Sequence, residues 1–263
     1  MVKSVAIGTF DGVHIAHQEL IKRADGVVII ERFASTITPG YNKALFTKKE
    51  TFFYLFDKIK NDTPQDFVNR LKEDFPNLEK IVVGYDFKFG KDKTGSIDTL
   101  KTLFSNIEVV KEFKVDGISI HSKLIRQFIV DSKIDKVNNL LGRYYSIKGY
   151  QIRGQGLGAK ELVPTINLNV TQYTMPRGVF AIRAKIEDKV YKAICFIGNR
   201  VTTDNSFSVE FYILEDYKLD FTYLPIEIEF LKFIRENRKF NTLKELKEQI
   251  YLDIKEVNNF FKS

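Results

Sequence analysis

The sequence changes its hydrophobic pattern near residues 141–142, and this change constrains the fold more than any other feature. Before it, short apolar runs alternate with helix-like stretches. The apolar runs are residues 2–7, 27–30, 81–83 and 107–110, and the helix-like stretches are residues 13–24, 47–60, 64–74 and 134–141. Continuous apolar runs between helices indicate a parallel sheet covered on both faces. The first half therefore predicts a doubly wound α/β domain that binds ligands beyond the carboxyl ends of its strands.

The second half is rich in strand-like segments with little helix between them. The predicted strands are residues 179–186, 190–197, 209–214 and 226–233, with Asp188 and Lys189 as a hairpin turn. Successive short strands indicate an antiparallel barrel or sandwich. A final helix fits residues 242–262, where Thr242 and Glu245 have the spacing of a capping box. We place the domain boundary at this change of pattern, giving domains 1–140 and 141–263.

Composition excludes several classes of protein. The single cysteine, Cys195, rules out an internal disulfide and a cysteine-based zinc cluster. No apolar run approaches the ~20 residues that cross a bilayer, so we expect no membrane partner and a cytoplasmic location. The net charge is +7 but is spread over both halves. Such a surface favours anionic ligands. Without a lysine or arginine run we expect no nucleic acid partner. The oligomeric state stays open.

The most informative segment of the first half is residues 8–17, which leave a strand, turn through two glycines and enter a helix. His14 and His17 are three residues apart, so both are expected on one face of the first helical turn. A helix N-terminus offers N–H groups and a positive dipole end to a phosphate. Two imidazoles beside it could stabilise negative charge on phosphorus during transfer to another phosphate. We therefore take both histidines as catalytic candidates.

This segment resembles the His-x-Gly-His signature of nucleotidylyltransferases, and more narrowly the adenylyltransferase domain of bacterial bifunctional riboflavin kinase/FAD synthetases. Residues 83–90 and 120–126 resemble the second and third motifs of that domain. The resemblance implies a Rossmann-like nucleotidylyltransferase fold. It also implies contacts to ATP or its phosphates from Gly8, Thr9, Phe10, Asp11, Ser122 and Arg126, and to the flavin from Asp86 and Phe87.

The second candidate site begins with three alternating glycines, Gly154, Gly156 and Gly158, which would let the backbone approach phosphates closely. A Pro-Thr-x-Asn sequence follows at residues 164–167. The Thr165 hydroxyl can ligate Mg²⁺, and the Asn167 amide can hold the metal or a phosphate, since Mg²⁺ favours oxygen ligands beside nucleotide phosphates. The sequence has no Walker A motif, so any kinase needs a different phosphate cradle.

This block resembles the riboflavin kinase signature, and the resemblance continues through residues 178–181, 197–200, 208–211 and 231–240. It implies an antiparallel β-barrel kinase domain with a terminal helix. It also implies that Glu210 is the general base, that Arg235 contacts the flavin, and that Mg²⁺ acts with ATP as co-substrate. On its strand, Glu210 is expected on the opposite face from Val209 and Phe211.

Taken together, the two resemblances imply an enzyme that phosphorylates riboflavin to FMN with one ATP and adenylylates FMN to FAD with a second, releasing pyrophosphate. The sequence departs from the family at Ala16, at His121 and Lys123, and after residue 30, where the flavin-side Phe-x-Pro-x-Pro stretch is not recognisable. Two alternatives stay open. One is a riboflavin kinase with a divergent N-terminal domain. The other is a non-catalytic regulator that binds flavin or nucleotide.

Overall fold

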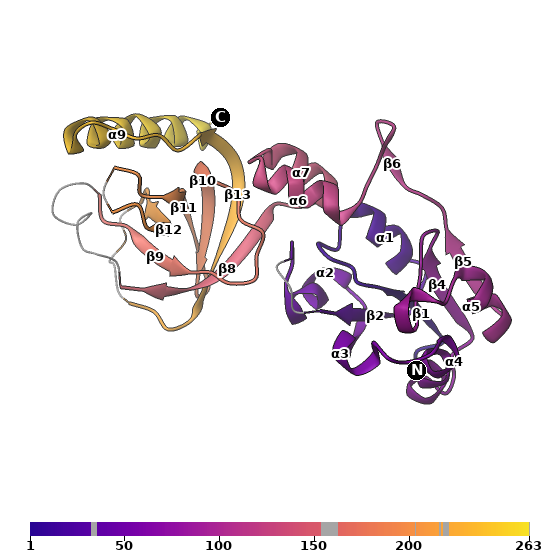
Figure 1. The fold of residues 1–263 in the computed structure, drawn as a ribbon. Coiled ribbons are helices and arrows are strands. Elements are labelled where there is room, and N and C mark those ends of the chain that lie inside the picture. Colours follow the sequence, from indigo (N-terminus) through magenta and orange to yellow (C-terminus); the bar gives the residue numbers. More distant parts are fainter. Residues whose placement is uncertain (33–35, 154–162, 203, 216, 218–220, 263) are drawn as a thin grey trace. The chain divides into compact units, whose positions relative to one another are not determined.

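The computed structural model describes residues 1–263 except 33–35, 154–162, 203, 216, 218–220 and 263. The chain divides into two compact units, residues 1–124 and 125–263 (Figure 1). The division lies before the expected boundary at residue 140. The reason is the packing of helix α7 (Ile134–Leu141), whose apolar side chains are buried and which contacts strands of the second unit.

The first unit is built on a five-stranded parallel sheet with the strand order β3-β2-β1-β4-β5. Its strands are β1 (Ser4–Gly8), β2 (Gly26–Glu31), β3 (Glu50–Leu55), β4 (Lys80–Gly84) and β5 (Ile107–Val110). Its helices are α1 (Ile15–Ile21), α2 (Ala44–Thr47), α3 (Phe56–Ile59), α4 (Pro64–Asp74) and α5 (Ile97–Leu103), followed by the small hairpin β6 (Lys114–Val115) and β7 (Ile118–Ser119). This is the Rossmann-like arrangement that the alternating pattern predicts.

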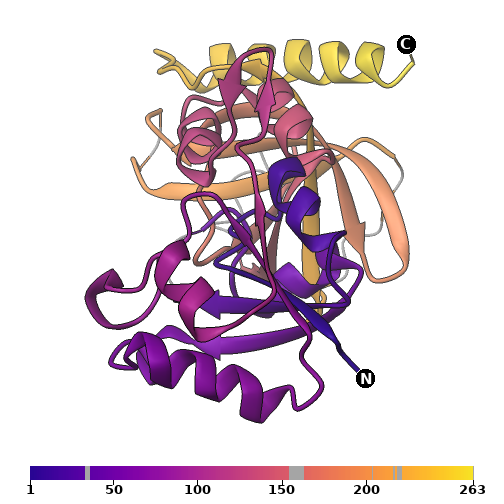
Figure 2. The same ribbon diagram turned by 90° about the vertical axis from the view of Figure 1, so that its right-hand side faces the viewer.

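Both faces of the sheet are covered, because alternate residues of each buried strand point to opposite sides. On one side, Val5 and Ile7 of β1 belong to a core with Leu71 of α4 and Leu100 of α5. On the other, residues 6, 27 and 82 belong to a core with Ile21 of α1. Figure 2 shows α1 and α4 on opposite sides of the sheet.

The helix predicted over residues 47–60 is wrong. Residues 50–55 form β3, and within the predicted range only Thr47, the last residue of α2, and residues 56–59 are helical. Thr51, Phe52, Phe53 and Tyr54 are β-branched or aromatic, the residue types that fit a half-buried pleated surface. They pair in parallel with residues 27–30 of β2. Residues 50–55 are therefore extended because they pair with the edge of β2, although the spacing of their apolar residues also fits a helix.

The second unit is a closed antiparallel barrel of six strands in the order β10-β11-β12-β9-β8-β13. Its strands are β8 (Tyr145–Ile152), β9 (Ile166–Asn169), β10 (Gly178–Ile186), β11 (Lys189–Asn199), β12 (Phe207–Ile213) and β13 (Pro225–Arg235). Four of these confirm the predicted strands, and β8 and β9 were not anticipated. The β10–β11 register pairs Ile186 with Lys189, so the hairpin turn is Glu187–Asp188 rather than Asp188–Lys189, with Glu187 at φ +54°.

Helices frame the barrel. α6 (Ser122–Val130) continues the chain into the second unit, and α7 follows. Asn138 of α7 donates to the Phe230 carbonyl at 3.0 Å and accepts from the Tyr145 amide at 2.7 Å, so it ties the helix to β13 and β8. The final helix α9 (Leu243–Phe260) confirms the predicted one, with Thr242 capping the Glu245 amide at 3.1 Å. In the described part of the chain, no helix is long and apolar enough to cross a membrane.

One ion pair of the first unit is fully buried. Lys43, at the end of a 3₁₀ turn (Gly40–Lys43), contacts Glu31 at the end of β2, and their side chains are 3% and 0% exposed. Removing one partner of a buried pair leaves an uncompensated charge, which typically costs about 3–5 kcal/mol. We therefore predict that Lys43→Met lowers the free energy of unfolding of this unit by about that amount, measured by urea titration followed by far-UV circular dichroism.

The matched control is Lys22→Met, which breaks the exposed Lys22–Glu19 pair and should leave the urea midpoint nearly unchanged. The double variant Lys43→Met/Glu31→Leu should recover most of the loss, because no charge is then left buried. A Lys43→Met midpoint equal to that of the control would show that the pair is not structural.

Candidate active sites

The first candidate site is a cavity of about 350 Å³ in the first unit, at the carboxyl ends of the parallel strands. Residues that end or directly follow β1, β4 and β5 line it, as do the start of α1 and residues 119–122. Of the residues predicted from the sequence, Gly8, Thr9, Phe10, His14, His17, Asp86, Phe87 and Ser122 line this cavity. A cavity therefore lies beyond the carboxyl ends of the strands, where the sequence predicts that ligands bind.

A strained turn presents the histidines. Phe10, Gly12 and Val13 have φ values of +45°, +82° and +41°, a region that β-branched residues rarely enter. The turn is closed by the Val13 amide donating to the Phe10 carbonyl at 3.0 Å. Burial of the Phe10 and Val13 side chains in the core holds it in place. Strain of this kind persists where packing over-determines the backbone, commonly at functional sites.

The two histidines are stacked. His14 is the N-cap of α1 rather than part of its first turn, and its ring lies 3.5 Å from that of His17 with 19° between the planes. The His14 Nδ1 accepts the backbone N–H of His17 at 3.3 Å. An accepting Nδ1 carries no proton, so the neutral ring carries its proton on Nε2. This hydrogen bond therefore gives His14 a defined donor nitrogen.

Burial favours the uncharged form of His17 in the folded protein. It is partly buried, and its Nδ1 is a buried atom without a hydrogen-bond partner. Desolvation lowers its pKa well below 6.5, and the neighbouring His14 and Lys43 lower it further. A neutral His17 can donate a hydrogen bond to an anionic group in the cavity.

Asp11 and Ser122 hold the loops around the cavity. The Asp11 carboxylate accepts the amides of Ile37 and Thr38 at 2.8 and 3.3 Å, and the Ser122 hydroxyl donates to the Asp11 carbonyl at 2.9 Å. Asp11 is buried and does not belong to the cavity lining. Arg126 lies one turn beyond Ser122 on α6. The predicted phosphate contacts of Asp11, Ser122 and Arg126 stay predictions.

The lining of the cavity also includes aromatic and basic side chains. The Arg32 guanidinium lies over the Phe56 ring, 4.0 Å from its centroid, and both residues line the cavity. Asp86 and Phe87 also line it, and their flavin contacts stay predictions. Residues 33–35, part of the stretch that departs from the family, lie outside the described residues.

The second candidate site lies on the barrel, where strand register brings Glu210 and Asn167 together. β12 pairs Glu210 with Asn167 of β9 and, on its other side, with Phe196 of β11. Val209 and Phe211 are buried, and Glu210 lies between them and is half-buried. Its position on the opposite strand face is therefore confirmed.

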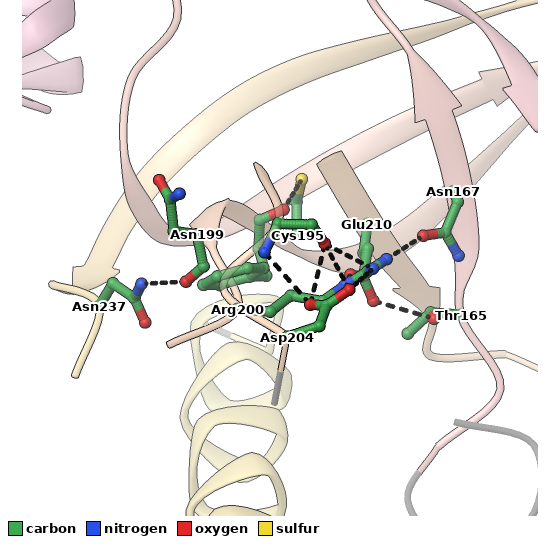
Figure 3. A network of polar contacts seen from close by, with 10 residues as sticks. Thr165, Asn167, Cys195, Asn199, Arg200, Asp204, Glu210 and Asn237 are labelled. Atoms are coloured by element: carbon green, nitrogen blue, oxygen red, sulfur yellow. Dashed lines mark hydrogen bonds and ion pairs between the residues drawn. The ribbon is translucent and has the colours of Figure 1, made fainter. Parts of the chain in front are cut away.

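Figure 3 shows the polar network around this carboxylate. The Thr165 hydroxyl donates to Glu210 Oε2 at 3.3 Å. Arg200 approaches the other oxygen, Oε1, with its Nε at 2.5 Å. The Arg200 Nη2 donates to Asn167 Oδ1 at 2.9 Å. The predicted base and the two predicted metal ligands therefore lie in one connected network.

The donor set of this network suits Mg²⁺ in its chemistry. Thr165 and Asn167 offer a hydroxyl and an amide oxygen, and Mg²⁺ binds such oxygens together with substrate phosphates. Arg200 occupies one lone pair of the Asn167 oxygen and leaves the second. The three glycines, Gly154, Gly156 and Gly158, lie outside the described residues, so their role is still a prediction.

Two further residues of the barrel, Arg235 and Cys195, are held within the protein by an ion pair and by burial. The Arg235 guanidinium contacts the buried Asp253 of α9 through Nε and Nη2, at 2.9 and 2.7 Å, and donates to the Glu236 carbonyl at 2.9 Å. It joins β13 to α9, and its predicted flavin contact stays a prediction. Cys195 is buried, and burial raises the pKa of its thiol, so it is not a reactive nucleophile.

The residue that sequence reasoning left without a role is Arg200. It stands in the Ile-Gly-Asn-Arg segment, but no local spacing connects it to residues 165, 167 and 210. Only the β11–β12 and β12–β9 pairings bring these positions together.

Comparisons with known proteins cover both units. Residues 141–261 match the family model described as riboflavin kinase, and residues 48–124 match the one described as FAD synthetase. The chain is 31% identical to a bifunctional riboflavin kinase/FMN adenylyltransferase of Bacillus subtilis, covering 98% of this chain and 93% of the relative. A protein of Listeria monocytogenes with the same description is 29% identical, covering 98% and 92%.

A solved structure has the same fold throughout. The crystal structure of a protein from Streptococcus pneumoniae, described as a macrolide-efflux protein, superposes with a TM-score of 0.85 at 26% identity. The superposition covers 98% of this chain and 94% of that one. The arrangement of a parallel sheet followed by a barrel and a terminal helix is therefore shared over the whole length.

The lowered pKa of His17 predicts a pH-dependent stability. The folded state keeps His17 neutral, whereas the unfolded chain takes up a proton below pH 6.5. The free energy of unfolding should therefore fall as the pH drops below 6.5, by up to about 1.4 kcal/mol per pH unit from this residue. Urea titrations of the wild type and of His17→Gln at pH 7.5, 6.0 and 5.0 should show a steeper decline for the wild type. Parallel declines would contradict the assignment.

Proposed function

The chain belongs to the family of bifunctional riboflavin kinase/FMN adenylyltransferases, and from this we propose that it makes both flavin cofactors. The barrel unit phosphorylates riboflavin to FMN with ATP. The first unit transfers AMP from a second ATP to FMN, giving FAD and pyrophosphate. The observation that carries the kinase half is the meeting of Thr165, Asn167 and Glu210 in one network.

In the kinase reaction, Glu210 acts as the general base. One of its oxygens takes the proton of the ribityl 5′-hydroxyl as that oxygen forms a bond to the γ-phosphorus of ATP. The bond between the γ-phosphorus and the β,γ-bridging oxygen breaks, and ADP leaves with the electron pair. Mg²⁺, when bound, neutralises charge on the phosphates. Thr165 and Asn167 are the residues that would hold it.

In the adenylyl transfer, a phosphate oxygen of FMN attacks the α-phosphorus of ATP, and pyrophosphate leaves as the bond to the α,β-bridging oxygen breaks. No protein nucleophile is required. His14 donates from Nε2, and neutral His17 can also donate, so the pair stabilises the charge that develops on the α-phosphate oxygens. The strained turn at residues 10–13 places the Phe10 ring edge-to-face with that of His17, at 5.2 Å between centroids.

The lining of the cavity supports a flavin phosphate as the acceptor. Arg32 and Phe56 present a stacked cation and ring to the cavity. A guanidinium suits a phosphate, and an aromatic side chain suits a planar ring system. These residues supply the kind of surface that the unrecognised Phe-x-Pro-x-Pro stretch would otherwise provide. A cytoplasmic location stays a prediction.

The two-site proposal predicts opposite effects of two substitutions. Glu210→Gln removes the base and should slow FMN formation by about 10²–10⁴-fold, while FAD formation from supplied FMN continues. His17→Ala removes a donor to the transferring phosphate and should slow FAD formation by about 10²–10³-fold, while FMN still accumulates. The measurement is a chromatographic time course of FMN and FAD with riboflavin, ATP and Mg²⁺.

The activity that each variant keeps reports on the unsubstituted unit, and a circular dichroism spectrum like that of the wild type is the control that the substituted unit is folded. Loss of both activities in a folded variant would contradict the separate sites. Wild-type protein that makes FMN alone would favour the kinase with a divergent N-terminal domain. Tight flavin binding without any ATP consumption would favour the non-catalytic regulator.

A further inference from the structure

Arg200 lies at the centre of the kinase network, although the proposed mechanism assigns it no step. Its Nε contacts Glu210 Oε1 at 2.5 Å, its Nη2 donates to Asn167 Oδ1 at 2.9 Å, and its Nη1 donates to the Ser206 hydroxyl at 3.1 Å. Asp204 lies further away, 3.8 Å from Nη1. Figure 3 shows the guanidinium beside the Glu210 carboxylate, with a further contact to the Asn167 side chain. One cation therefore contacts both the base and a metal ligand.

We infer that Arg200 is a positioning residue of the kinase reaction, which holds the Glu210 carboxylate so that Oε2 is the oxygen that accepts the substrate proton. The inference rests on the proposed kinase function. Oε1 is occupied by a permanently charged donor. Oε2 accepts a longer hydrogen bond, from the Thr165 hydroxyl at 3.3 Å.

The orientation of Asn167 depends on the same guanidinium. Arginine has donors and no acceptor, so it can face only the oxygen of the amide. The Asn167 Oδ1 therefore points to Arg200, and the amide nitrogen points away from it. Asn167 is 7% exposed, and a buried amide that loses this bond could turn over. Arg200 thus sets the direction of a side chain that is expected to face the metal or a phosphate.

The geometry calls for arginine rather than lysine. The three donor nitrogens lie in one plane and reach residues 167, 206 and 210 in three directions. The rigid fork of arginine makes such contacts together, whereas the single ammonium of lysine acts as a point charge. Replacement by lysine would keep the charge beside Glu210 but lose the simultaneous hold on Asn167.

A purely structural role explains less of the geometry. The turn that follows β11 is already closed by its backbone. The Arg200 amide donates to the Ser206 carbonyl at 2.9 Å, and the Asn205 amide donates to the Arg200 carbonyl at 3.1 Å. The Asn199 side chain adds a bond to the Asn205 carbonyl at 2.9 Å. The reach of the guanidinium across to Glu210 and Asn167 is therefore not needed to form the turn.

The test compares Arg200→Gln and Arg200→Lys with the wild type in the full-length protein. For FMN formation, Arg200→Gln should lower kcat by about 10–100-fold, the scale of a misplaced catalytic group, with KM for riboflavin and ATP changed less than about threefold. Arg200→Lys should recover only part of kcat. FAD formation from supplied FMN, which the first unit carries out, should stay at the wild-type rate, and an unchanged circular dichroism spectrum and urea midpoint should report that the barrel of each variant is folded.

A double-variant cycle separates positioning from general stability. In the Glu210→Gln background the base is gone, so adding Arg200→Gln should cause a smaller fold-loss of kcat than it does alone, the remainder coming from its contact with Asn167. The control is Arg183→Gln, which breaks the Arg183–Glu229 pair on a part-exposed face of the same barrel and should leave kcat unchanged.

Two results would overturn the inference. One is an Arg200→Gln kcat within twofold of the wild type. The other is an equal fold-loss from Arg200→Gln with and without Glu210→Gln, as a purely structural role would give. Wild-type protein that makes no FMN would instead reject the proposed kinase function.

Discussion

Strand pairing is the constraint on which both candidate sites depend. In the first unit, β1 pairs in parallel with β2 and β4, so the segments that leave these strands meet at one edge of the sheet. There they enclose the cavity that holds His14 and His17. In the second unit, the antiparallel registers of β12 set Glu210 opposite Asn167. In both cases the chemistry follows from which residues are brought opposite or beside one another by backbone hydrogen bonds.

The two units hold their candidate catalytic side chains by different interactions. The histidines of the first unit are held by backbone strain and by apolar burial, which keeps His17 neutral. The Glu210 carboxylate of the barrel is held by an ion pair with Arg200, whose guanidinium also donates a hydrogen bond to Asn167. A neutral donor suits the stabilisation of charge on a phosphate, and an oriented carboxylate suits the removal of a proton. The environment of each site thus matches the step that we propose for it.

Sequence reasoning succeeded where a pattern is local and periodic. The buried parallel strands, four barrel strands and the capped helix α9 all follow from apolar spacing and end signals. It failed at residues 50–55, where an aromatic run fits either state and the edge of β2 decides. It also placed His14 within a helical turn, whereas the structure makes it the N-cap. Arg200 received no role, because its partners stand 10 and 33 residues away in the sequence.

The sequence by itself determined the two-part architecture, the family and the candidate site residues, because apolar periodicity and motif spacing are properties of neighbouring positions. Only the tertiary structure decided how those residues are held. Three contacts depend on packing or on pairing between distant segments. They are the stacking of the two imidazoles, the buried Glu31–Lys43 ion pair and the Arg200–Glu210 ion pair. Burial and long-range strand register set the protonation state and the orientation of a side chain. The residues next to it in the sequence do not determine its burial or its register.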